Sequence, residues 1–361
     1  MSAFYIAGIG IALFIEFLLI SKKNKSSSDK ILTLWMFAIL LHLFLFYLYF
    51  TGDIYRFPFL LGLEHPFPLL HGVFLYLYVA SLTRQLPTRQ WALVFHAVPI
   101  TLMYAYLATF FVLPAEQKLD IYRNHGAGYE LFMLLRSYAI TCSGLFYVAW
   151  SALLLKRHAR NIRNQFSDVE KINLRWLQIL TLGMGGIWFL VIFFGNDMLI
   201  YAGVVVFVFI IGFFGIRQAN IFSQEPVTLG DGDTKEKYQK SGLTEKASEE
   251  LHQQLKRVMT EEALYKNSEL SIDDLATRLG AHANHLSQVI NQKEMKNFYD
   301  FVNTYRVEEF KKLVAMPKNR QFTLLSLAYD CGFSSKTSFN RVFKKTTGLT
   351  PSEFTSRPTP S

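Results

Sequence analysis

Long apolar stretches alternate with short polar ones over the first 216 residues, and the rest of the chain is polar with helical periodicity. Most of the apolar stretches approach the ~20 residues that an α-helix needs to cross ~30 Å of hydrocarbon. The pattern therefore predicts seven membrane-spanning helices, at residues 3–20, 31–50, 66–82, 91–113, 129–155, 176–195 and 198–216.

The basic residues between these stretches predict their orientation. The loops at 21–30, 84–90 and 156–175 hold twelve Lys and Arg, whereas those at 51–65, 114–128 and 195–197 hold three. Because Lys and Arg concentrate in cytoplasmic loops, the first set is predicted to lie inside. Seven spans then place the N-terminus outside and the C-terminal part in the cytoplasm. A soluble protein with seven buried helices fits neither the segment lengths nor this alternation.

A polar linker is predicted at 217–243, where Pro226, Gly230 and Gly232 disfavour a helix. An amphipathic helix follows at 244–263, with Thr244 as its N-cap. Its apolar face could form a dimer seam or dock onto the domain that follows. That face consists of Leu251, Leu255, Val258 and Met259.

Residues 324–345 have the pattern of a helix, a tight turn and a second helix. Gly332 falls where the chain must reverse, and glycine adopts positive φ without strain. Phe339, Val342 and Phe343 form the inner face of the second helix, and a polar, cationic set faces outward. Such a face suits a DNA major groove, although a solvated helical hairpin gives the same pattern.

A second copy of this plan lies upstream, with Ala276 and Gly280 in the first helix and turn. One amphipathic helix, from about 298 to 314, joins the two units. Over about 270–354 the chain resembles the DNA-binding domain of the AraC (arabinose-regulator) transcription factors. The residues that carry the resemblance are Leu275, Ala276, Gly280, Asn284, Leu286-Ser287-Gln288-Val289-Ile290-Asn291, Ala328, Gly332-Phe333-Ser334, Phe339, Phe343-Lys344, Gly348, Pro351 and Glu353-Phe354.

The chain departs from the family pattern at three places: His282 replaces a serine cap, Ala283 replaces a longer polar residue, and Thr355-Ser356 displaces the closing arginine to Arg357. The resemblance implies double-stranded DNA as the partner. It also implies that the second unit reads bases and that its last lysines hold phosphates. The implied contacts are Asn284, Ser287 and Gln288 in the first unit, and Lys336, Thr337, Asn340, Arg341, Lys344 and Lys345 in the second.

Polar residues near the outer ends of the predicted spans could gather into a ligand pocket, because such groups are costly in hydrocarbon. Helix–helix hydrogen bonding is the alternative. The pocket residues would be Glu64, His65, Glu130, Arg136 and Asp197, binding an unknown small-molecule or peptide signal. In the third inner loop, His158 and Asp168 are expected to be solvated.

Composition limits the remaining possibilities. The net charge of +9 lies mostly in the membrane-side loops, but residues 317–361 carry a local +5 around the proposed reading helix. Two cysteines, Cys142 and Cys331, imply no disulfide framework. We find no phosphate-binding glycine loop, nucleophile elbow or metal-ligand spacing, so no cofactor, metal or enzymatic activity is expected.

The sequence thus predicts an all-α protein: a seven-helix membrane domain at 1–216, a linker at 217–243, a connecting helix at 244–263 and an AraC-like domain with two helix-turn-helix units at 264–357. The expected function is transcription regulation from the bacterial inner membrane, with a homodimer as a further possibility. The alternative is a seven-span transporter or receptor whose cytoplasmic tail docks a protein.

Overall fold

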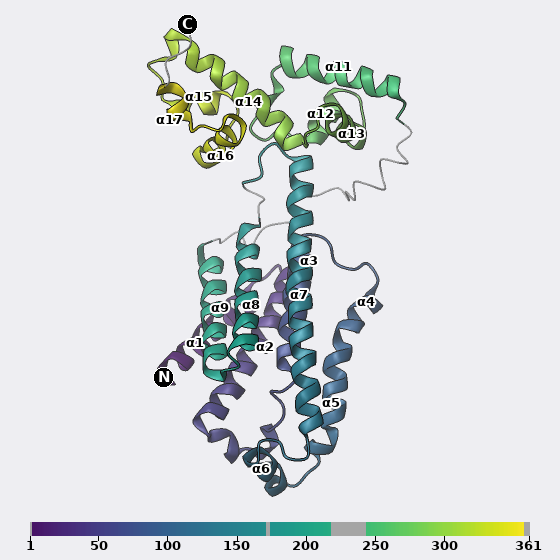
Figure 1. Ribbon diagram of the computed structural model, residues 1–361, viewed down its shortest axis with the longest axis vertical. Coiled ribbons are helices and arrows are strands. Elements are labelled where there is room, and N and C mark those ends of the chain that lie inside the picture. The colour runs from purple at the N-terminus through teal and green to yellow at the C-terminus, as the bar shows by residue number, and fades with distance from the viewer. Residues whose placement is uncertain (1, 171–173, 218–242, 357–361) are drawn as a thin grey trace. The chain divides into compact units, whose positions relative to one another are not determined.

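The computed structural model describes residues 2–170, 174–217 and 243–356, and these residues form helices and connecting turns without a β-sheet (Figure 1). The chain divides into two compact units, and the boundary falls inside one helix, after Lys156. The first unit holds the described residues up to 156 and from 174 to 217. The second holds 157–170 together with 243–356. Most of the predicted linker lies outside the described residues, as does Arg357.

Mostly apolar helices make up the first unit. They are α1 (Ser2–Ser21), α2 (Ser27–Thr51), α3 (Phe67–Leu82), α4 (Gln90–Val94), α5 (Val98–Phe111), α6 (Ala115–Arg123), most of α7 (Glu130–Gln165), α8 (Arg175–Phe193) and α9 (Asp197–Arg217), with short 3-10 turns η1 (Asp53–Arg56), η2 (Pro58–Leu60) and η3 (Phe95–Ala97). Figure 1 shows the longer ones, such as α5, α7, α8 and α9, running side by side.

Five helical stretches of the described chain are long and apolar enough to cross a membrane, rather than a clear seven. They are Ser27–Thr51, Trp91–Phe111, Glu130–Gln165, Arg175–Phe193 and Asp197–Phe214. The other two predicted spans correspond to the shorter apolar helices Tyr5–Ser21 and Phe67–Leu82. The predicted fourth span is interrupted by the η3 turn just before Pro99, which removes a backbone hydrogen-bond donor.

Helices of the first unit pack through small residues and a few polar pairs. Gly144 of α7 lies directly against the indole of Trp188 on α8, so any side chain at position 144 would collide with that ring. Small residues commonly allow such close helix contacts in membranes. His42 and His71 share a hydrogen bond of 2.9 Å between α2 and α3. The bond between His42 and His71 fits the alternative interpretation, in which single polar residues of the spans form hydrogen bonds between helices.

The second unit is a set of short helices around the long helix α14. Figure 1 shows α14 between the α12–α13 pair and the α15–α16 pair. The helices are α11 (Glu245–Glu261), α12 (Ile272–Arg278), α13 (Ala283–Lys293), α14 (Phe298–Ala315), α15 (Leu324–Asp330), α16 (Lys336–Thr347) and α17 (Pro351–Ser356), with turns η4 (Leu264–Lys266) and η5 (Pro317–Asn319).

Helix α11 docks onto the first helix-turn-helix unit. Leu255 and Met259 are fully buried, and Leu251 is nearly so, in one apolar cluster with Leu275, Leu286 and residues of α14. Thr244 caps the helix by accepting the backbone N–H of Ala247. The apolar face of α11 is therefore covered by its own domain, and this excludes most of it as a dimer seam.

The segment after α7 packs into the second unit, although the sequence placed it in a membrane-side loop. The guanidinium of Arg306, on α14, donates all five of its N–H groups, and two of these bonds end on Ser167. The Ser167 backbone N–H donates to the Leu270 carbonyl at 3.1 Å. Burial lowers the pKa of Arg306 to about 10, so the side chain stays charged at neutral pH.

Candidate nucleic-acid interface and polar pocket

Helix α16 presents the outer face that the sequence predicted. Its inner residues Phe339, Val342 and Phe343 are buried against α14. Ser335 caps its first turn by accepting the backbone N–H of Ser338. All six predicted contact residues of this helix are exposed: Lys336, Thr337, Asn340, Arg341, Lys344 and Lys345.

Two of these six side chains already have protein partners. Lys345 forms an ion pair of 2.6 Å with Asp300, at the start of α14. The Arg341 guanidinium donates to the Tyr299 hydroxyl at 3.3 Å and lies 4.0 Å from the carboxylate of Glu170. Any DNA contact by Lys345 or Arg341 therefore competes with these partners. Sequence spacing gave no sign of this, because the partners lie far away along the chain.

The first helix-turn-helix unit offers a smaller polar face. Asn284 is exposed and Ser287 half-buried, but Gln288 is only 8 % exposed. Helix α11 packs against α13, and Lys293 pairs with Glu245 of α11 at 2.6 Å. The burial of Gln288 does not match the open face expected for a base-reading residue. His282 makes no side-chain capping bond to α13, in keeping with its departure from the family pattern.

Position 332 requires a glycine for two reasons, the backbone conformation there and the closeness of neighbouring atoms. The φ of Gly332 is +92°, in the left-handed region, as the sequence predicted. A Cβ atom there would also come within 2.7 Å of the Lys266 carbonyl oxygen. Gly280, the corresponding turn residue of the first unit, has a φ of +63°, but a Cβ atom there would meet nothing within 4 Å. The two turns share a geometry, but only the second is closely packed.

Two carboxylates lie at the N-terminal end of α16. Asp168 accepts a hydrogen bond from the Ser334 hydroxyl, and Glu170 accepts one from the Ser335 hydroxyl. The expectation that His158 is solvated was wrong, because this side chain is buried. Asp168 is partly exposed and is held by its hydrogen bond to Ser334. These contacts could not be predicted, because residues more than 160 positions apart share no local pattern.

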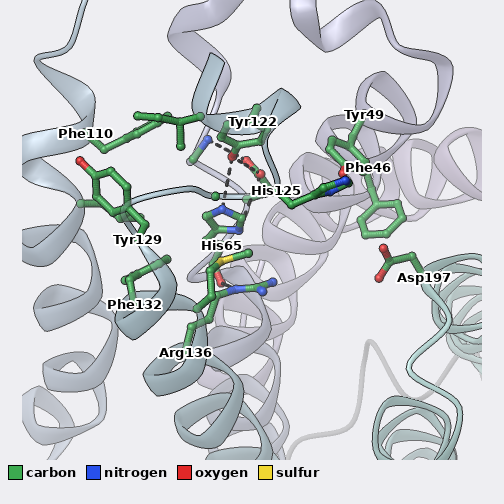
Figure 2. A pocket seen from close by; sticks show the side chains of 16 residues that line it. Phe46, Tyr49, His65, Phe110, Tyr122, His125, Tyr129, Phe132, Arg136 and Asp197 are labelled. Carbon is green, nitrogen blue, oxygen red and sulfur yellow. Dashed lines mark hydrogen bonds and ion pairs between the residues drawn. The ribbon is translucent and has the colours of Figure 1, made fainter. Parts of the chain in front are cut away.

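Four of the five predicted pocket residues line one cavity of about 240 Å³ in the first unit: Glu64, His65, Arg136 and Asp197. Figure 2 shows Arg136 and Asp197 at this cavity together with aromatic side chains. A neighbouring cavity of about 330 Å³ shares Glu64, Arg136 and Asp197 with the first. Glu130 is exposed and accepts the Gly128 N–H instead, so the structure does not bring it to the pocket.

Several residues of the pocket form hydrogen bonds with one another. Tyr122 donates its hydroxyl to Glu64 at 2.6 Å, a contact that the sequence did not reveal (Figure 2). Burial raises the pKa of Glu64 and lowers that of His65 to about 3, so the imidazole is neutral. Arg136 donates its Nε–H to the His65 carbonyl at 3.3 Å. Within the described residues its two terminal nitrogens make no hydrogen bond or ion pair, so they can bind an anionic group.

Comparison with known proteins supports the C-terminal part of this picture. Residues 275–357 match the model of a helix-turn-helix domain family. The chain is 32% identical over 91 residues to an uncharacterised HTH-type transcriptional regulator of Staphylococcus aureus strain COL. It is 29% identical over 94 residues to PqrA of Proteus vulgaris, described as a probable transcription factor. These matches cover 25% and 26% of this chain.

The likeness is confined to that domain. The match spans 12% of the Staphylococcus protein and 75% of PqrA. No solved structure matches the chain. The chain therefore carries a C-terminal helix-turn-helix domain of the type found in transcription regulators. The matches do not reach the apolar helices before it.

Proposed function

We propose that the chain is a membrane-anchored transcription regulator that binds specific DNA sequences with its two helix-turn-helix units. The observation that carries this proposal is the exposed polar face of α16 on a domain that matches helix-turn-helix proteins. In such folds the second helix enters the major groove. Residues of α16 would read bases, and α13 would contribute Asn284 and Ser287.

The membrane part of the proposal rests on the first unit. Its helices expose many large apolar side chains, among them Phe17, Leu102 and Leu182 at 65%, 65% and 75%. An apolar surface of this extent suits lipid better than water. We propose that seven helices span the bacterial inner membrane, namely the five longer stretches together with the shorter α1 and α3. The N-terminus would then lie outside and the DNA-binding domain in the cytoplasm.

Reporter fusions test this topology. Fusions after Lys25 and Arg89 should report the cytoplasm, and fusions after Arg56 and Arg123 the outside, because of the loop charges. A fusion after the last residue should report the cytoplasm. A C-terminal domain found outside would end the proposal, since it could not reach chromosomal DNA.

DNA binding is tested with the full-length chain in lipid nanodiscs. Its affinity for a random-sequence duplex should fall steeply with salt, because cationic side chains release counterions from phosphates. Selection from a random pool should then enrich a defined sequence. Binding without any salt dependence or sequence enrichment would favour the alternative, a receptor or transporter whose tail docks a protein.

The pocket supports a sensing role for the membrane unit. The free terminal nitrogens of Arg136 suit a carboxylate, Asp197 suits an amine, and aromatic side chains line the space between. The signal would then be a small zwitterion such as an amino acid or a short peptide. A thermal-shift screen of amino acids and dipeptides tests this, with Arg136→Gln expected to abolish stabilisation and the exposed Arg56→Gln to preserve it.

A further inference from the structure

The segment 166–170, which follows α7, is firmly attached to the DNA-binding unit. Ser167 is 1% exposed and accepts hydrogen bonds from Arg306 and Asn303. Val169 and Ile162 are buried in the same apolar cluster as Phe339 and Phe343 of α16. The segment is thus held by both polar and apolar contacts, and its position beside α16 is defined.

This attachment directs two negative charges to the end of α16 that reads DNA in helix-turn-helix proteins. Asp168 and Glu170 accept hydrogen bonds from the hydroxyl groups of Ser334 and Ser335, and Glu170 also faces Arg341. N-terminal residues of a reading helix contact base edges in the major groove. Duplex DNA carries one negative charge per ~1.7 Å of its axis, so the carboxylates would repel it there.

We propose that the segment 166–170 is an internal mask of the second reading helix, and that it must leave α16 before this helix enters DNA. The carboxylates take the places at Ser334, Ser335 and Arg341 that phosphates and bases would otherwise occupy. The segment follows α7 directly, and α7 also carries Arg136 of the pocket. One helix therefore joins the candidate signal site to the mask. The proposal rests on DNA binding by α16.

The test removes the two charges and keeps the side-chain shapes. The full-length chain in nanodiscs carries Asp168→Asn with Glu170→Gln, and its affinity for a fluorescent random-sequence duplex is measured by anisotropy. We expect at least five-fold tighter binding than the wild type. The segment remains covalently in place, and its Ser167 contacts are untouched, so folding should be unaffected.

A matched control separates masking from general charge. The control variant, Glu261→Gln with Glu308→Gln, also removes two negative charges from the second unit. Both residues are exposed, and each forms an ion pair within its own helix. This control should change affinity by less than two-fold. Equal affinities of test and control variants would overturn the mask while leaving DNA binding intact. Failure of every variant, wild type included, to bind would overturn both proposals.

A second measurement follows the segment itself. Val169 is 6% exposed, so Val169→Cys in a Cys142→Ser background should react slowly with maleimide. Cys331 is buried and contributes a small background, which is measured on the protein that keeps Val169. Saturating duplex should raise the labelling rate at position 169 at least five-fold. An unchanged rate with DNA bound would mean that the segment stays on α16, contrary to the proposal.

Discussion

At the scale of single residues, a comparison of Gly332 with Gly280 separates the backbone strain of positive φ from the effect of close packing. The sequence alone cannot distinguish these two effects. Both glycines have positive φ, but only Gly332 lies against neighbouring carbonyl oxygens. Gly280→Ala should cost about 1–2 kcal/mol of unfolding free energy, the strain of a left-handed residue. Gly332→Ala should cost more, because the η4 turn must also move. Chemical denaturation of the two variants checks this, and equal losses would contradict the close packing.

Arg341 and Lys345 should differ in how they support DNA binding. Arg341→Ala should cost about 1–3 kcal/mol of binding free energy and relax preference at one base, if the side chain reads a guanine.

Lys345→Ala should weaken binding to all sequences alike and reduce the salt slope by about one, as for a phosphate contact. Selection and salt titration with each variant measure both effects. Unchanged affinity in two folded variants would mean that another face of α16 binds.

At the scale of elements, local sequence patterns predicted most of the helices but few of the contacts between them. Apolar periodicity and turn residues marked α15, α16 and the glycine turn between them. The burial of Gln288 and the pair between Lys345 and Asp300 were not predicted. These features depend on tertiary contacts, which leave no periodic signal in the chain.

Helix α11 offers a test of the choice between docking and dimerisation. Because Leu255 is fully buried against the first helix-turn-helix unit, Leu255→Ala should cost about 2–5 kcal/mol of unfolding free energy. The variant should keep the oligomeric state of the wild type, measured by light scattering in nanodiscs or detergent. Loss of a dimer with unchanged stability would instead indicate that Leu255 lies in a seam between two chains.

At the scale of the whole molecule, the chain passes between the two units three times: after Lys156, before Leu174 and in the predicted linker. The first crossing lies within α7, a 36-residue helix that belongs to both units. At ~1.5 Å per residue, α7 is about 54 Å long, well beyond the ~30 Å of a bilayer core. The sequence pattern placed the end of this span at residue 155, because the basic residues that follow are equally typical of a loop.

Lengthening the predicted linker should therefore have little effect. Ten Gly/Ser residues inserted after Gly232 would lower the effective concentration of the tethered domain by about 1.6-fold. We expect DNA affinity and signal response to change by no more than that, because α7 and its segment still hold the domain. Measured transcription that no longer responds to the signal would show instead that the linker transmits it.

The five hydrogen bonds of Arg306 have a consequence for how this protein can be cut or recombined. A fragment starting at residue 243 would contain the complete match to helix-turn-helix proteins but would lack Ser167, which accepts two of those bonds. Such a fragment should be less stable by about 1–3 kcal/mol. A synthetic peptide of residues 157–170 added in trans should restore part of the loss. The compact unit that contains the domain thus includes residues 157–170, a piece of chain that is translated before α8 and α9.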